Sequence, residues 1–365
     1  MRPIPYLKGL DILRFLAASL VVLAHAHYHL SQLHIPWLDG CALVYQGGPA
    51  VTFFFTLSGV LLTCLGIQEH RLHGRIDVRK FYWRRVLRIW PLYYGVVGLS
   101  LLFVFVLLPV FYPVAENRFP MPVSLLCLLF LVPNYLSANR LTSFGPANGL
   151  WSIGVEELFY LLFPFLFAGR NKRGRYVFRF VLALLVYAGL YLLMAYSALP
   201  VDIKRFLRSY AFQYMLTGCI FAAAWMQCRE HAKSLRWFNI MAVAVGVAAF
   251  CFSPDMKWPL VASVARAALF SVVILFTAQV DNRFFKNNPL VYFGKISYGI
   301  YMFHPFVSYL LRFGCARQEW MLRLVRESPS LYFILLLTGS IVAAHFSYRW
   351  YERRFLRLKE RAEPA

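Results

Sequence analysis

The sequence predicts an all-α fold, a polytopic transmembrane helix bundle with about ten spanning helices plus one short re-entrant or interfacial segment. Of the 365 residues, 60% are hydrophobic and 18% aromatic, and the mean hydropathy is +0.57. Apolar runs of about 20 residues, the length that crosses a bilayer as a helix, recur along the chain with short polar gaps. We therefore expect residues 1–365 to form a single integral-membrane domain with no fused soluble domain.

Ten apolar runs are long enough to span a bilayer. They are Leu10 to His29, Pro49 to Gly66, Ile89 to Tyr112, Trp151 to Ala168, Val177 to Ser197, Tyr210 to Cys228, Trp237 to Ser253, Pro259 to Val280, Leu290 to Leu311, and Leu331 to Tyr351. An eleventh run, Val123 to Leu136, is shorter and bounded by Pro120, Pro122 and Pro133. We interpret it as the re-entrant or interfacial segment, because proline interrupts a helix and the run is too short to span.

The distribution of positive charge predicts the orientation. With ten spans and a cytoplasmic N-terminus, most of the 38 Lys and Arg residues fall in inner segments, as the positive-inside rule requires. An eleventh span would move the basic segment from Arg170 to Arg179 to the outside. The last outer segment is an exception, because it carries Arg312, Arg317, Arg323 and Arg326. We expect both termini in the cytoplasm.

The net charge of +22 does not indicate a nucleic-acid-binding protein, because the basic residues lie between apolar runs and form no aromatic-interleaved patch. The seven cysteines form no C-x-x-C pair, and most of them lie inside apolar runs. This pattern argues against a disulfide framework and against a zinc site. We therefore expect no metal cofactor and no nucleic-acid partner, and membrane lipid as the surroundings.

Arg14 and His25 are the first candidate site residues. Eleven residues at about 100° each bring both side chains to one face of the first predicted helix, about 16 Å apart along its axis. Both side chains would then point into the same cavity, with Arg14 on the cytoplasmic side of the bilayer midplane and His25 on the outer side. A buried Asp11–Arg14 pair with a hydrogen-bonded histidine nearby is the structural alternative.

A basic segment runs into the third predicted span and contains Arg84, Arg85 and Arg88. Arg85 and Arg88 are one helical turn apart, a spacing that presents two guanidinium groups to phosphate oxygens such as those of coenzyme A. The alternative is that these charges only set the topology and contact anionic lipid.

Two carboxylates follow Trp151 and Ser152 near the outer end of the fourth predicted span. At about 8 Å below Trp151, Glu156 reaches the expected depth of His25, so it could fix the imidazole tautomer and stabilise the imidazolium. Glu157 lies beside it, and His304 on the ninth span falls at a similar depth. The alternative is that Glu156 and Glu157 form structural pairs.

The residues and their order resemble the acyltransferase-3 family of integral-membrane acyltransferases along nearly the whole chain. The matching motifs are Gly9-Leu10-Asp11 with Arg14 and His25, Phe53 to Gly59, Arg85 and Arg88 followed by Trp90-Pro91, Trp151-Ser152 with Glu156-Glu157 and Phe159-Tyr160, Gly294 to Tyr298 with Tyr301 and His304-Pro305, and Tyr351-Glu352-Arg353. The chain departs from the family at Gly154, where Ser is common, and at Leu158, where Gln is common.

The resemblance implies ten helices and an enzyme that transfers groups other than amino-acyl groups. The implied donor is cytosolic acyl-CoA, usually acetyl-CoA, and the implied acceptor is a hydroxyl of a polysaccharide or lipid-linked sugar outside a bacterial cytoplasmic (inner) membrane. It implies that His25 is catalytic, that Arg14 contacts the donor or shapes its site, and that Arg85 and Arg88 serve acyl-CoA binding or catalysis. We further predict that Glu156 and Arg14 are catalytic, that Arg84 and Ser297 also bind acyl-CoA, and that Trp151, Ser152 and His304 contact the acceptor.

In this hypothesis His25, oriented by Glu156, acts as a general base for direct attack or as a nucleophile through an acyl-imidazole. Because the sequence ends at Ala365 without the fused esterase-like domain of some relatives, we expect direct transfer or a separate partner. Two alternatives remain: a transporter or flippase for a lipid-linked sugar, and an acyltransferase for a small hydrophobic acceptor.

Overall fold

The computed structural model describes residues 7–107, 121–141, 145–167, 175–228, 259–279 and 288–361, and within these ranges the chain is helical and contains no strand. The helices, in chain order, are α1 (Lys8–Gln32), α2 (Gly47–His73), α3 (Val78–Leu102), α5 (Met121–Leu129), α6 (Asn134–Ala138), α7 (Trp151–Leu162), α8 (Tyr176–Tyr196), α9 (Val201–Arg208), α10 (Phe212–Cys228), α12 (Pro259–Thr277), α13 (Pro289–Lys295), α14 (Ser297–Arg317), α15 (Glu319–Glu327), α16 (Pro329–Ser347) and α17 (Arg353–Arg361). Short 3-10 or π-helical turns extend several of them: η1 (Ala42–Tyr45), η2 (Phe103–Leu107), η3 (Gly145–Leu150), η4 (Phe163–Phe167) and η6 (Tyr348–Glu352).

Seven helical stretches in the described ranges are long enough and apolar enough to cross a membrane. They are Lys8–Gln32, Gly47–His73, Val78–Val106, Gly145–Phe167, Tyr176–Tyr196, Pro259–Thr277 and Pro329–Leu358. Each overlaps one of the apolar runs predicted from the sequence. The helical class and several of the predicted spans are therefore confirmed, whereas the count of ten is not.

The other three predicted spans have different outcomes. Tyr210 to Cys228 contains α10, which has 17 residues and is shorter than the seven stretches above. Leu290 to Leu311 is not one helix, because the chain breaks at Ile296 between α13 and α14. Trp237 to Ser253 lies outside the described residues.

The break at Ile296 has a physical cause in the packing of α13 on α1. At Gly294 the two backbones approach so closely that a β-carbon would overlap the carbonyl group of Asp11. The contact holds α13 in place, and the chain turns at Ile296 before α14 begins at Ser297. A seven-residue helix and a 21-residue helix thus replace the single predicted span.

The run from Val123 to Leu136 forms α5, a turn and part of α6, none of which is long enough to span. Leu131 in the turn has a φ of 58°. The segment packs against α3, where Tyr93 donates a hydrogen bond to the carbonyl of Leu128 over 2.9 Å. This agrees with the predicted short, non-spanning segment.

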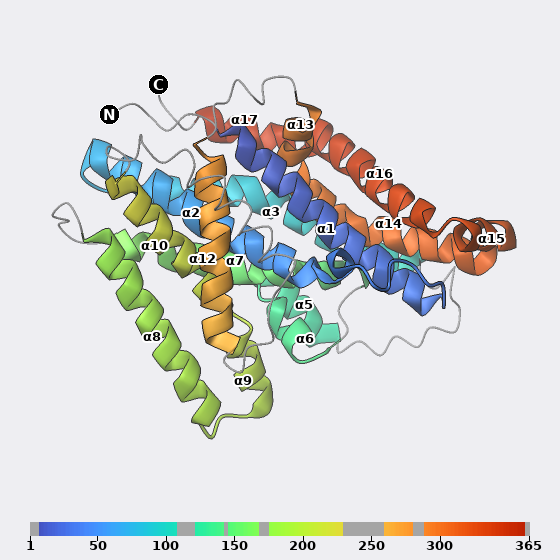
Figure 1. The fold of residues 1–365 in the computed structure, drawn as a ribbon, viewed down its shortest axis with the longest axis horizontal. Helices are drawn as coiled ribbons and strands as arrows, with labels where there is room; N and C mark the ends of the chain where they lie inside the picture. Colours follow the sequence, from blue (N-terminus) through green and yellow to red (C-terminus); the bar gives the residue numbers. More distant parts are fainter. Residues whose placement is uncertain are drawn as a thin grey trace.

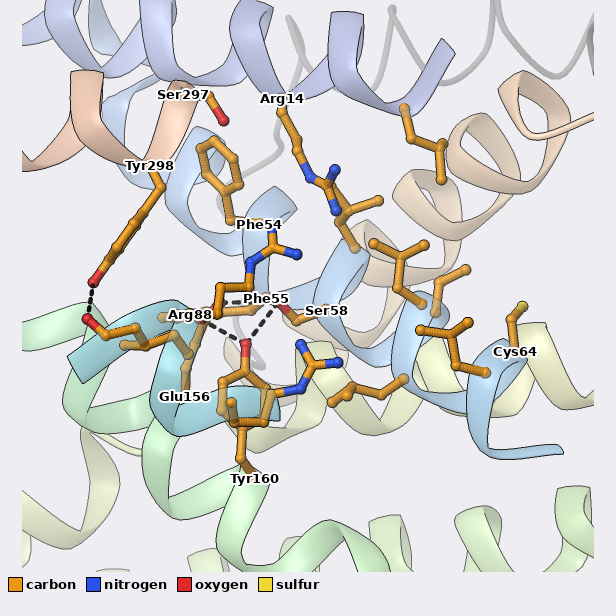
Figure 2. A pocket seen from close by; sticks show the side chains of 18 of the residues that line it. Arg14, Phe54, Phe55, Ser58, Cys64, Arg88, Glu156, Tyr160, Ser297 and Tyr298 are labelled. Carbon is orange, nitrogen blue, oxygen red and sulfur yellow. Dashed lines mark hydrogen bonds between the residues drawn. The ribbon is translucent and has the colours of Figure 1, made fainter. Parts of the chain in front are cut away.

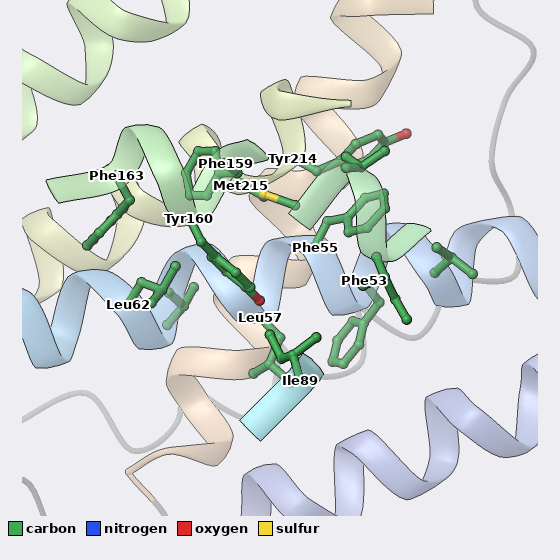
Figure 3. Close-up of a cluster of buried hydrophobic side chains, with 14 of the residues drawn as sticks. Phe53, Phe55, Leu57, Leu62, Ile89, Phe159, Tyr160, Phe163, Tyr214 and Met215 are labelled. Atoms are coloured by element: carbon green, nitrogen blue, oxygen red, sulfur yellow. The ribbon is translucent and has the colours of Figure 1, made fainter. Parts of the chain in front are cut away.

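The helices form two packed groups with α1 between them (Figure 1). In one group α10 packs against α2, α8 and α12, and in the other α14 packs against α16. Gly59 and Gly218 mark the α2–α10 crossing, since a β-carbon at either would overlap the backbone of the partner helix. Phenylalanines of α2 and α7, including Phe55 and Phe159, fill the core of the first group (Figure 3).

Helix α1 contributes one face to each group. Leu10, Ala17 and Val21 belong to the apolar core with α2 and α10, whereas Ala18, Val22, Ala26 and Leu30 belong to the core with α14 and α16. At about 100° per residue, positions 14, 25 and 29 fall where these two faces meet. The polar side chains of α1 therefore project into the junction of the two helix groups.

Candidate active site

A cavity of about 530 Å³ lies within the helix bundle and collects most of the predicted site residues (Figure 2). Side chains from α1, α2, α3, α7, α10, α12 and α14 line it. Its polar lining consists of Arg14, Ser58, Arg85, Arg88, Ser152, Glu156, Tyr160, Ser297, Tyr298 and Tyr301. The volume lies in the range of about 300–1,000 Å³ that is typical of small-molecule sites.

Helix α3 places two arginines in the cavity. Its first turn is held by Asp77, whose carboxylate accepts a hydrogen bond from the amide of Lys80 over 3.0 Å. The Arg85 guanidinium lies 5.6 Å from the ring centre of Tyr160, and its Nε atom is buried without a hydrogen-bond partner in the described part of the chain. Arg88, one turn later, is exposed to the cavity (Figure 2). The two guanidinium groups are thus available to an anionic ligand.

Arg84 points elsewhere. Its Nη2 lies 2.8 Å from a carboxylate oxygen of Glu69 on α2, and Arg84 does not line the cavity. One residue of helix rotates a side chain by about 100°, which explains why Arg84 and Arg85 face different surroundings. The structure therefore separates Arg84 from the other predicted cofactor-binding residues.

Arg14 enters the same cavity from α1 (Figure 2). Its Nη1 lies 2.8 Å from a carboxylate oxygen of Asp11, and the aspartate side chain is almost fully buried. The Asp11–Arg14 pair that the sequence suggested is present, but it coexists with a place in the cavity wall. Asp11 therefore anchors a guanidinium that a ligand in the cavity can reach.

Glu156 accepts two hydrogen bonds inside the cavity. Ser58 Oγ donates to one carboxylate oxygen over 3.0 Å, and Tyr160 Oη donates to the other over 2.8 Å (Figure 2). Among the described residues Glu156 forms no hydrogen bond with His25, so the expectation that it orients the imidazole was wrong. Although Glu156 and His25 were predicted at the same depth in the membrane, they do not meet, because Glu156 faces α2 and α3. The adjacent Glu157 accepts a hydrogen bond from Trp90 Nε1 over 3.0 Å.

The imidazole of His25 is oriented by its own helix. Its Nδ1 lies 2.8 Å from the carbonyl oxygen of Val21. Because a carbonyl only accepts hydrogen bonds, Nδ1 carries the hydrogen and the Nε2 lone pair is free in the neutral ring. His25 is exposed, so this basic nitrogen is on an accessible side chain.

His304 of α14 packs against His25. The two ring centres are 4.8 Å apart in an edge-to-face arrangement, and His304 is 2% exposed. His304 Nδ1 lies 2.6 Å from the carbonyl oxygen of Tyr301, so it also carries a hydrogen and leaves Nε2 as an acceptor. The structure therefore brings together two imidazoles with the same tautomer, and we name them the histidine pair.

The histidine pair is connected to the cavity through Tyr301. Tyr301 Oη donates to the carbonyl oxygen of Gly149 and accepts from Ser152 Oγ, each over 2.8 Å. Both Tyr301 and Ser152 line the cavity, whereas His25 and His304 do not. His25 thus lies just beyond the cavity wall rather than inside it.

Two further predicted residues have different positions. Ser297, the first residue of α14, lines the cavity and is 5% exposed. Trp151 does not line it, and its ring packs edge-to-face on Phe55 with centres 6.2 Å apart. Trp151 therefore supports the wall from behind, while Ser297 contributes to its surface.

Sequence reasoning did not select Ser58, Tyr160 and Tyr301 as site residues, although each lies in a motif that was noted. The four-residue spacing of Glu156 and Tyr160 on one helix was an available signal for their hydrogen bond. The bond of Ser58 to Glu156 crosses 98 positions, and no local pattern predicts it.

Comparison with known proteins shows which family the sequence matches. Residues 7–349 match the acyltransferase domain of the acyltransferase-3 family. The chain is 26% identical over 369 residues to the O-acetyltransferase OatA of Staphylococcus aureus strain NCTC 8325, and the same figures hold for OatA of strain COL. The alignment covers 95% of this chain, which spans 57% of the length of those relatives. No solved structure matches the chain.

Proposed function

The chain belongs to the acyltransferase-3 family, and on that premise we propose that it is a membrane O-acyltransferase that moves an acetyl group from acyl-CoA to a hydroxyl of an extracytoplasmic polysaccharide or lipid-linked sugar. The name of the relative OatA, an O-acetyltransferase, supports the acetyl group as cargo. We place the protein in a bacterial inner membrane with both termini in the cytoplasm, because most positive charges then lie inside.

The convergence of Arg14, Arg85 and Arg88 on one cavity carries this proposal. Coenzyme A has a pyrophosphate and a ribose phosphate, and guanidinium groups bind such oxygens through charge-assisted hydrogen bonds. The buried Nε of Arg85 has no partner in the described chain and is satisfied by a phosphate oxygen of the donor. The donor phosphates lie against α3 and the acyl end points along the cavity toward Tyr301.

We place the acyl-transfer step at the histidine pair. His25 Nε2 takes the proton of the acceptor hydroxyl as its oxygen attacks the thioester carbonyl, a new C–O bond forms and the C–S bond breaks. The imidazolium then returns the proton to the departing coenzyme A thiolate. An acyl-imidazole route uses the same nitrogen and differs in giving a burst of coenzyme A before the acceptor is added.

Labelled acetyl-CoA tests the function directly. Membranes containing the protein are incubated with acetyl-CoA labelled in the acetyl group, and labelled glycan is counted after removal of the nucleotide. The proposal expects label in an alkali-labile O-ester, and membranes containing a His25→Ala variant provide the background. A transporter or flippase would leave the label in acetyl-CoA, and that outcome would refute the proposed function.

A further inference from the structure

Four arginines in the last predicted outer segment run against the positive-inside rule, and the structure separates one of them from the rest. Arg323 has an ion-pair partner, because its Nη2 lies 2.9 Å from Glu319 on the exposed surface of α15. Arg312 is instead half-buried on α14, and its guanidinium lies over the ring of Tyr309 at 6.0 Å. It is also within electrostatic range of His29 on α1.

Arg312 is the end of a polar stripe that begins at the histidine pair. His304, Ser308 and Arg312 follow one another at four-residue spacing on α14, so they share one side of that helix. His25 and His29 have the same spacing on α1, and α1 packs against α14. We name these five residues the outer seam. His25 packs against His304, and the charge of Arg312 acts on His29. The polar residues of the two helices therefore follow one another in the same order along the seam.

The outer seam contains polar atoms that the described chain leaves unsatisfied. His29 Nδ1 and Ser308 Oγ are buried without hydrogen-bond partners. Tyr332 of α16 interacts with Ser308 through its Oη, but among the described residues neither hydroxyl forms a hydrogen bond of full geometry. Buried polar groups are almost always paired, because an unpaired one has lost its hydrogen bond to water without a replacement. A hydroxyl-rich ligand in the seam would satisfy these groups.

A metal ion does not explain the outer seam, since the described residues contain no group of three or more His, Cys, Asp or Glu side chains placed to hold one. An internal carboxylate does not explain it either. Within the described ranges Arg312 forms no ion pair with Asp or Glu. A half-buried guanidinium in an apolar bundle is stabilised by an anion. For Arg312 that anion would be supplied by a ligand.

We propose that the outer seam is the acceptor subsite, and that Arg312 selects an acceptor sugar carrying an anionic group, a carboxylate or a phosphate. This inference rests on the proposed function, because it assigns the hydroxyl to His25. Arg312 lies two helical turns beyond His304, a rise of about 12 Å. The acceptor saccharide therefore carries its anionic group several bonds away from the hydroxyl that reacts.

The test measures binding, so it does not depend on acyl transfer. Purified protein in detergent is titrated with glucose, glucuronate and glucose 1-phosphate, and the thermal unfolding midpoint gives an apparent Kd for each sugar. We expect wild-type protein to bind at least one anionic sugar about tenfold more tightly than glucose. Glucuronate and glucose 1-phosphate distinguish a carboxylate from a phosphate.

Variants assign the preference to Arg312. Arg312→Gln is expected to remove the tenfold preference and Arg312→Lys to keep part of it, which also controls for misfolding. Arg323→Gln, a charge removed from the same outer region, should leave the preference intact. If wild-type protein does not distinguish glucose from the anionic sugars, or if Arg312→Gln keeps the preference, the inference is wrong. Loss of labelled transfer in the acetyl-CoA assay would refute the proposed function without changing these affinities.

Discussion

The cavity and the outer seam differ in how their buried polar side chains are paired. The cavity is rich in full charges, and its Arg14 is anchored by Asp11 while Glu156 is held by two hydroxyl donors. In the described part of the outer seam there are imidazoles, a hydroxyl and one guanidinium, but no carboxylate. The difference indicates that donor binding and base chemistry occupy separate regions. His25 is oriented by a backbone carbonyl, and within the described ranges its basic nitrogen has no hydrogen-bond partner.

Removing the positive charges of the cavity should have the largest effect, and the effect should be on donor binding. The double variant Arg85→Gln/Arg88→Gln is expected to raise the Kd of acetyl-CoA by about 100-fold or more, because each charge-assisted hydrogen bond contributes about 1.5–3 kcal/mol. Equilibrium binding of labelled acetyl-CoA measures the effect. Arg84→Gln is the matched control, since Arg84 pairs with Glu69 away from the cavity. Equal weakening in both variants would show that the effect is non-specific.

Glu156 should affect stability and donor binding more than the chemistry of His25. In Glu156→Gln an amide nitrogen would face the hydroxyl donors Ser58 and Tyr160, leaving one of them unpaired at a cost of about 2 kcal/mol. Thermal unfolding in detergent measures this loss. A variant of normal stability that had lost only its maximal rate would instead support a direct role of Glu156 at His25.

Tyr301 connects the two regions, so its hydroxyl should matter for rate but not for donor affinity. Tyr301→Phe removes the hydrogen bonds to Gly149 and Ser152 and should lower kcat about tenfold through misplacement of the histidine pair. The control is Tyr298→Phe, because the Tyr298 hydroxyl bonds the Ile89 carbonyl and does not reach His304. Steady-state kinetics on both variants should show a lower kcat for Tyr301→Phe alone.

The smallest expected effect is at the start of α3. Asp77→Ala removes the helix cap and should cost about 1 kcal/mol, whereas Asp77→Asn keeps it. The hydrogen bond from Lys80 lowers the pKa of the Asp77 carboxyl. Because the folded pKa is depressed, the charged cap contributes stability above the unfolded pKa and loses it as pH falls through the folded pKa. Unfolding midpoints of wild type and Asp77→Asn should therefore converge in acid.

The sequence predicted the positions on single helices well. The shared face of Arg14 and His25 follows from the helical repeat, and both residues lie at the junction of the two helix groups, but only Arg14 lines the cavity that both were predicted to face. The spacing of Arg85 and Arg88 likewise predicted their common cavity. These relations depend only on local geometry, which 3.6 residues per turn determines.

Relations between helices were not predicted as well. The depth of Glu156 follows from the sequence, but the direction in which it faces depends on how α7 packs, and it meets Ser58 rather than His25. The contact of His304 with His25 also required the fold. The single span from Leu290 to Leu311 was wrong because the approach of Gly294 to α1 is a tertiary contact.

The most direct test of the account is to measure donor binding and transfer together in His25→Ala. The arginine-lined cavity binds the donor and the histidine pair performs the chemistry, so we predict a Kd for acetyl-CoA within about twofold of wild type and a transfer rate reduced by about 10²–10⁴-fold or more. Transfer at the wild-type rate by His25→Ala, or loss of acetyl-CoA binding by this variant in a folded state, would contradict that division of roles.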